Sequence, residues 1–151
     1  MPPALASRYA GADRSPGFLL WRASLIWQRL QREALEDLGL THVQFVLLAG
    51  VVWLSGGGEP LTQVQLAEHA GTDVMMTSQV LRTLERKGLI RRVAHPTDSR
   101  ARALTPTRAG RALAERAVRR VEEVDAMFFE RAGMKTEQLA RVLGRLVSSG
   151  G

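Results

Sequence analysis

The sequence has 151 residues, which suits one domain with a sizeable core that needs no metal or disulfide to hold it. Hydrophobic residues at 45% and charged residues at 24% exclude a disordered chain, a collagen-like chain and a small secreted scaffold. The absence of cysteine excludes disulfides, thiolate metal sites and a cysteine nucleophile, and the net charge of +6 raises the question of where the basic excess lies.

The N-terminal part of the sequence predicts a tail followed by a helix. Residues 1 to about 16 are rich in Ala, Pro, Gly and Ser without an apolar period, and they carry no signal-peptide pattern. From Phe18 an apolar stripe at steps of four predicts a helix that ends at Gly39. The longest apolar run, Phe45 to Leu54, is about half of the roughly 20 residues that span a bilayer. We therefore expect a cytoplasmic protein with no membrane partner.

The next two helices begin with the same signal. Thr41 followed by Gln44, and Thr62 followed by Gln65, each place Thr at the N-cap and Gln three residues later, the pattern of a capping box. The first of these helices is apolar enough to be buried. The second is short and ends at Gly71.

A third helix, a hairpin and two more helices complete the predicted order. Val74 to Lys87 has helical periodicity with a polar outer face. Leu89 to Ala94 and Ala101 to Thr105 have strand character, and the turn formers between them predict a short β-hairpin. A long helix follows Thr107, and a last one follows Gly133. The fold class is therefore mainly α with a small β-hairpin.

The short helix, the turn at Gly71 and the helix at 74–87 form a helix-turn-helix, and the hairpin adds a wing. Between Asp73 and Arg111 there are nine basic and three acidic residues, whereas the remainder carries 12 of each. Because this basic stretch coincides with the second helix and the wing, it favours binding of double-stranded DNA over a merely solvated face. The residues expected to face the major groove are Thr77, Ser78, Gln79 and Arg82. Met75 and Met76 either touch a thymine methyl or pack inside, and the sequence leaves both open.

Three motifs follow one another here in a specific order and spacing. They are Leu84-Glu85-Arg86-Lys87-Gly88-Leu89-Ile90, Pro96-Thr97-Asp98-Ser99-Arg100 and Thr107-Arg108-Ala109-Gly110. With them the sequence resembles the MarR family of winged-helix transcription regulators over nearly its whole ordered length. The resemblance implies a homodimer, paired through N- and C-terminal helices, that binds palindromic DNA and loses affinity for it on binding a small aromatic or anionic effector.

The resemblance also implies boundaries and residue roles. The boundaries are a loose tail at 1–16 and one domain at 17–151, with a winged helix-turn-helix at about 41–106 and dimerisation helices at about 17–38 and 107–148. Arg100 looks like the family's minor-groove arginine, Arg102 leaves the same strand face, and Asp98 at the turn orients Arg100. His95 stands where an Asp is common. Pro106 stands where a strand Leu is usual, which puts the end of the second wing strand in doubt.

The expected function is sequence-specific, DNA-binding transcription regulation by a homodimeric repressor on a pseudo-palindromic operator. Dimerisation is also favoured by apolar stripes that exceed what a helix-turn-helix must cover, with Phe128, Leu139, Val142 and Leu146 on the last two helices. Trp21, Trp27 and His42, on the first two helices, are candidate effector contacts, although tryptophan at helical spacing also suits a core.

Other classes of function have less support in the sequence. The three histidines, His42, His69 and His95, are far apart in sequence, so we expect no metal site, and no cofactor is implied. No constellation of acid, base and nucleophile favours an enzyme. The open alternative is a winged-helix adaptor that binds protein without specific DNA binding, and the basic excess argues against it.

Overall fold

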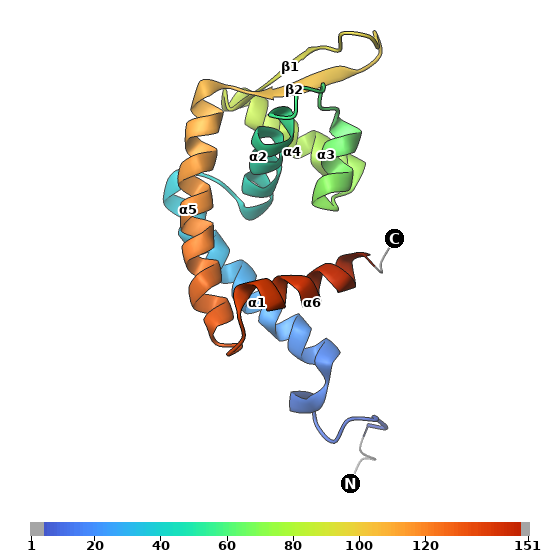
Figure 1. Cartoon of the computed structure of the whole chain (residues 1–151), viewed down its shortest axis with the longest axis vertical. Helices are drawn as coiled ribbons and strands as arrows, with labels where there is room; N and C mark the ends of the chain where they lie inside the picture. Colours follow the sequence, from blue (N-terminus) through green and yellow to red (C-terminus); the bar gives the residue numbers. More distant parts are fainter. Residues whose placement is uncertain (1–4, 149–151) are drawn as a thin grey trace.

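The computed structural model describes residues 5–148, in which four helices, a hairpin and two further helices follow the predicted order (Figure 1). The elements are η1 (Ala12–Arg14), α1 (Pro16–Leu35), η2 (Glu36–Leu38), α2 (His42–Ser55), α3 (Gln63–Ala70), α4 (Val74–Arg86), β1 (Ile90–Ala94), β2 (Arg102–Pro106), α5 (Arg108–Glu130) and α6 (Thr136–Ser148). The predicted fold class, mainly α with a β-hairpin wing, is confirmed.

The start of the chain differs from the predicted loose tail. Ser15 caps α1 by accepting a hydrogen bond from the Phe18 amide (3.4 Å), and Pro16 takes the first helical position, where its missing N–H leaves no bond unmade. The 3₁₀ turn η1 precedes this cap. Residues 5–11 have no helix or strand, and residues 1–4 of the predicted tail lie outside the described residues.

Both predicted capping boxes form. The Thr41 hydroxyl accepts from the Gln44 amide (3.2 Å) while the Gln44 side chain accepts from the Thr41 amide (3.1 Å). Thr62 and Gln65 repeat this arrangement at the start of α3. At the end of α3, Gly71 has a φ of 69°, a left-handed conformation that side chains disfavour. These local signals set where α3 stops and α4 begins.

The wing strands pair antiparallel from Ile90 opposite Pro106 to Ala94 opposite Arg102. On the far side of β2, the Leu104 amide donates to the Leu61 carbonyl (2.7 Å). Because backbone amides alternate along a strand, the nitrogen of Pro106 also points away from β1. The proline therefore removes no hydrogen bond between the strands, and β2 extends one residue beyond the predicted end at Thr105.

The apolar core lies in the winged-helix lobe that α2, α3, α4 and the hairpin form with the first half of α5 (Figure 1). Its fully buried large side chains include Leu47, Leu48, Leu66, Leu81, Leu84, Ile90 and Leu104. By contrast, α6 buries none of its described residues, and α1 buries only Gln31 and Leu35. The exposed apolar residues of these two helices are Phe18, Leu19, Leu20, Trp21, Leu25, Val142, Leu143, Leu146 and Val147. One copy of the chain therefore leaves two apolar faces uncovered at the end opposite the wing.

Within residues 5–148 no single helix is long and apolar enough to cross a bilayer, although the bent pair Pro16–Leu38 and His42–Ser55 reaches that length and composition together.

Candidate nucleic-acid interface

Helix α4 presents a mixed stripe to solvent. Its N-cap is Asp73, whose carboxylate accepts from the Met76 amide (2.8 Å), and its inner face buries Leu81 and Leu84 in the core. At 100° per residue, positions 75, 79, 82 and 86 fall within about 60° of one another on the opposite face. These residues, all exposed, are Met75, Gln79, Arg82 and Arg86. The helix therefore offers one continuous face with an apolar end and a basic end.

Thr77 does not belong to this outer face, and the prediction that it points outward is wrong. Its exposed fraction is 0%, and its hydroxyl donates to the Asp73 carbonyl (2.7 Å) and lies 2.7 Å from the Thr72 hydroxyl. The physical reason is its position one helical turn before Leu81, which places it on the buried side. Thr77 thus supports the turn between α3 and α4. Ser78 is half-buried at the edge of the exposed stripe.

The tip of the wing is held by side chains that accept backbone hydrogen bonds. Nδ1 of His95 accepts from the amides of Thr97 (3.2 Å) and Asp98 (3.1 Å), the task an Asp carboxylate performs at such a turn. Oδ1 of Asp98 accepts from the Arg100 amide (2.9 Å). Asp98 therefore orients the backbone of Arg100, and His95 substitutes for Asp without loss of the turn.

The two wing arginines are both exposed but occupy different local structures. Arg102 is the first residue of β2, whereas Arg100 lies in the turn before the strand. The expectation that strand alternation sends their side chains to one face is therefore wrong, because alternation applies only within a strand. Arg100 is instead free of the sheet and projects from the tip.

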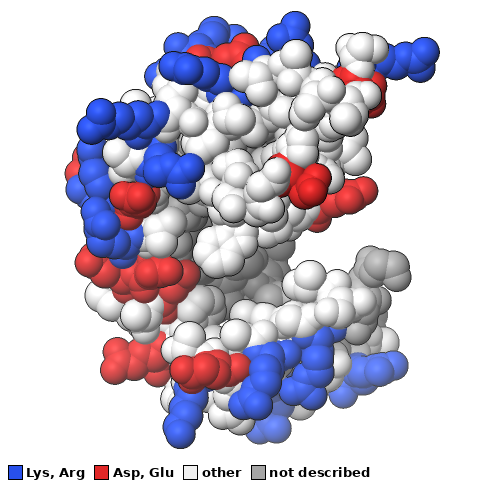
Figure 2. Space-filling view, turned by 45° about the horizontal axis from the view of Figure 1, so that its top comes forward, with Lys and Arg blue, Asp and Glu red and all other residues white. Residues whose placement is uncertain are grey.

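A basic groove of about 980 Å³ lies between α4, the wing and the start of α5. The arginines that line it are Arg82, Arg91, Arg92, Arg102 and Arg108, with Glu85 as the acidic member. Arg92 is half-buried and its Nε lies 3.6 Å from Oε2 of Glu85, so it is partly neutralised, whereas Arg91 is exposed. Figure 2 shows Lys and Arg at the upper edge of the molecule, the end that carries the wing in Figure 1, and further groups of them at the left side and the lower edge. Such a surface attracts a phosphate backbone.

The residues expected to contact an effector are divided between two environments. Trp27 of α1 donates from Nε1 to Oδ1 of Asp125 on α5 (2.7 Å), and its ring meets His42 edge-on at 5.0 Å between centroids. Nε2 of buried Gln31 donates to the same oxygen (2.7 Å). Burial lowers the pKa of His42 despite the opposing charge of Asp125, so the ring is neutral at pH 7. Trp21, by contrast, is 61% exposed on α1.

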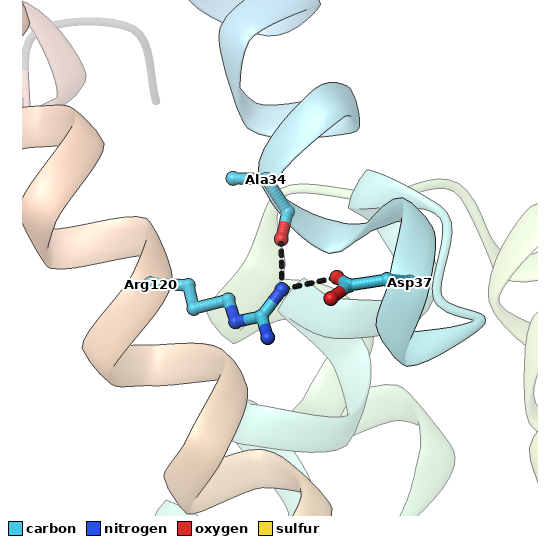
Figure 3. Close-up of polar contacts among 3 residues, drawn as sticks. All are labelled: Ala34, Asp37 and Arg120. Carbon is cyan, nitrogen blue, oxygen red and sulfur yellow. Dashed lines mark hydrogen bonds and ion pairs between the residues drawn. The ribbon is translucent and has the colours of Figure 1, made fainter.

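A second contact fixes α5 against the end of α1. Nη1 of Arg120 donates to the Ala34 carbonyl (3.4 Å) and pairs with the Asp37 carboxylate (Figure 3). A cation near the last carbonyls of a helix satisfies one of them and opposes the helix dipole. Trp27 and Arg120 thus both join α1, or the turn that follows it, to α5.

A second groove, of about 790 Å³, lies between α2, α3 and α5. Phe45, Val52 and Trp53 of α2 give it an apolar wall, and Trp53 is 79% exposed there. Arg111 and Arg119 of α5 lie on its other side. None of the three residues expected from the sequence to contact an effector lines it. Across residues 5–148, no group of three or more His, Asp or Glu side chains is placed to hold a metal ion.

The model of the MarR family matches residues 40–101, which span the helix-turn-helix and most of the wing. The HTH-type transcriptional regulator YdcH of Bacillus subtilis (strain 168) is 43% identical over 141 residues, which cover 93% of this chain and 95% of that protein. The chain belongs to the MarR family. It is a DNA-binding transcription regulator and not an enzyme, and the adaptor alternative is not favoured.

Two solved structures of MarR-family proteins are similar to this chain over most of its length. CouR from Rhodococcus jostii RHA1, bound to p-coumaroyl-CoA, has a TM-score of 0.80 and 25% identity, and the alignment covers 93% of this chain and 94% of CouR. Rv2887 of Mycobacterium tuberculosis, in complex with p-aminosalicylic acid, has a TM-score of 0.64 and 32% identity over 91% of this chain and 99% of Rv2887. Both alignments extend well beyond residues 40–101, which the family model matches.

The sequence analysis did not single out two features of this MarR-family chain. Arg86 extends the exposed stripe by one turn, and its spacing of seven from Gln79 is a signal that could have found it. No sequence signal indicates the groove between α2, α3 and α5. The apolar run of α2 predicts a buried helix, but it does not show which face of that helix is left exposed.

Proposed function

We propose that this protein is a homodimeric repressor of the MarR type that binds a pseudo-palindromic operator. The observation that carries the proposal is the continuous exposed face of α4 from Met75 to Arg86, flanked by the basic wing. A helix about 10–12 Å wide fits the major groove, and two-fold symmetry then requires half-sites about one turn, roughly 10 base pairs, apart. Rv2887, which is 34% identical to this chain over 97% of its own length, is named as a transcriptional repressor.

The two DNA-binding elements divide their work in this proposal. Gln79 and Arg82 lie on the outer stripe of α4 and read base edges in the major groove, with Ser78 at the border of the contact. Arg100, at the tip of the wing, enters the minor groove, where a narrow A·T-rich segment has the most negative potential. Arg91 and Arg102 meet phosphates, which add affinity without sequence preference.

Arg100→Ala and Gln79→Ala test this division. We expect Arg100→Ala to weaken binding to all sequences by about tenfold and to lower the slope of log affinity against log salt by roughly one charge per subunit, because each subunit of the dimer loses one cation near the phosphates. Gln79→Ala is expected to change the preferred bases with little change in that slope. Salt titrations and consensus selection with each variant measure both effects. An altered major-groove consensus for Arg100→Ala, with only uniform weakening for Gln79→Ala, would show that the elements are wrongly assigned.

We further propose that a small aromatic acid or its thioester acts as effector in the groove between α2, α3 and α5. Its volume of about 790 Å³ lies in the range of small-molecule sites. The apolar wall at Phe45 and Trp53 suits an aromatic ring, and Arg111 or Arg119 suits its anionic group. CouR with p-coumaroyl-CoA and Rv2887 with p-aminosalicylic acid hold ligands of this kind.

Such a ligand would act on DNA binding through the elements that line the groove. Helices α2 and α3 pack against α4, whereas α5 runs from the wing to the opposite end of the molecule (Figure 1). We expect the ligand to bind more tightly when the spacing between α3 and α5 is unsuited to DNA. The ligand then lowers the affinity for DNA by a certain factor, and DNA lowers the affinity for the ligand by the same factor.

A pair of tryptophan variants separates this groove from the residues first expected in the effector site. With a panel of aromatic acids and their thioesters, we expect at least one compound to raise the melting temperature and release operator DNA. Trp53→Ala should abolish both effects, because it removes the exposed aromatic wall. Trp21→Ala, the control outside the groove, should retain them in protein that light scattering shows to be dimeric, because Trp21 lies on the exposed apolar face of α1. Loss of the effects only in Trp21→Ala would instead place the effector at the first two helices.

A further inference from the structure

The first turn of α4 exposes apolar side chains at the end of the DNA-facing stripe. Met75 is 76% exposed, Val74 is exposed beside it, and neither belongs to the apolar core of the lobe. Nε2 of Gln63 donates to the Val74 carbonyl (3.4 Å), so the start of α3 with exposed Val64 lies next to this turn. Of the two roles that the sequence leaves open for Met75, packing inside is therefore wrong. What remains is a contact outside the chain.

The position of Met75 on α4 indicates what its side chain contacts. Met75 precedes Gln79 by four residues and Arg82 by seven, so the three side chains share one face of α4. Side chains on a helix lean toward its N-terminus, and the N-terminal residues of a recognition helix are the ones that reach base edges. Met75 therefore enters the major groove together with Gln79 and Arg82.

The chemistry of methionine selects one group in that groove. Its thioether has no hydrogen-bond donor and is only a weak acceptor, so it cannot distinguish the amino and carbonyl groups of the bases. The C5-methyl of thymine is the one apolar group that an unmodified base pair presents in the major groove. We propose that Met75 specifies a thymine in each half-site by packing against this methyl group. The inference rests on the proposed function, because it requires α4 to lie in the major groove.

Deoxyuridine gives a direct test, because replacing one thymine by uracil removes the methyl group and leaves the hydrogen-bonding edge unchanged. The operator is first defined by selection from random duplex DNA, and each thymine of one half-site is then replaced in turn. At one position we expect wild-type affinity to fall about fourfold, the equivalent of about 0.8 kcal/mol for one buried carbon group.

Three variants assign that penalty to the side chain. Met75→Ala should bind the thymine and uracil operators equally, and Met75→Leu should keep the penalty because it keeps an apolar contact. Met76→Ala is the matched control, since its side chain lies about 100° away around the helix, and it should keep the full penalty. Because Met75 is 76% exposed, both of its variants should melt at the wild-type temperature.

Two outcomes overturn the inference while leaving the proposed function intact. One is a wild-type protein that binds every uracil operator as tightly as the thymine operator. The other is a uracil penalty that persists unchanged in Met75→Ala. A wild-type protein that selects no DNA sequence at all overturns the proposed function together with this inference, and that result is visible before any uracil is introduced.

Discussion

Leu146→Arg should convert the dimer into a monomer and lower operator affinity by at least about 100-fold, because a single subunit loses the avidity of two linked half-site contacts. Leu146 is 62% exposed in one chain and lies on the apolar face of α6, so the arginine is solvated in the monomer. In a dimer built from α1 and α6 it would be a buried, unpaired charge. Light scattering and operator titration at micromolar protein measure the two effects.

Ser148→Arg is the matched control for this change. It adds the same charge to the same helix at an exposed position about 160° around the helix from Leu146. We expect it to remain dimeric with wild-type affinity. A monomeric wild-type protein with full operator affinity, or a Leu146→Arg variant that stays dimeric, would contradict dimerisation through the chain ends.

Gly110→Ala should destabilise the protein by about 3 kcal/mol, because the new methyl group meets backbone and not a flexible side chain. A Cβ at this position would overlap the Leu89 carbonyl, on which the first turn of α5 packs. The surrounding bonds fix that turn. Thr107 donates from its hydroxyl to the Gly88 carbonyl (2.6 Å) and accepts from the Gly110 amide (3.0 Å), and its own amide donates to the Leu89 carbonyl (3.1 Å).

Urea denaturation measures this loss as a lower midpoint with an unchanged slope. Gly17→Ala provides the control, since no neighbouring atom lies within 4 Å of a Cβ there and alanine is the better helix former. We expect it to be neutral or to stabilise by up to about 1 kcal/mol. A Gly110→Ala protein within 0.5 kcal/mol of wild type, a change typical of ordinary surface positions, would mean that α5 does not pack this closely on the wing base.

Local signals explain why so much of the fold could be predicted. Thr41 with Gln44, Thr62 with Gln65 and the stop at Gly71 each act within a few residues, so the sequence contains all that decides them. Thr77 was misplaced because it was judged by its polarity, whereas its spacing from Leu81 puts it inside. The burial of Thr77 could therefore have been predicted from the sequence, because helical periodicity is a better guide to burial than the polarity of one side chain.

The parts that could not be predicted depend on contacts between distant segments. Trp27 and Asp125 are 98 residues apart, and nothing local to either indicates their hydrogen bond. The groove between α2, α3 and α5 combines Trp53 with Arg119, from helices that the sequence describes only by their own periodicity. For Arg100, the hairpin pattern predicts a turn and two strands but not the residue at which the second strand begins.

Selection of bound sequences from random duplex DNA tests the central claim most directly, that two copies of the α4 face and the wing read a two-fold site. We expect a pseudo-palindromic consensus with half-sites about 10 base pairs apart, an A·T-rich segment at the wing position and a thymine in each half-site. Enrichment of a single asymmetric half-site, or of no sequence at all, would contradict it.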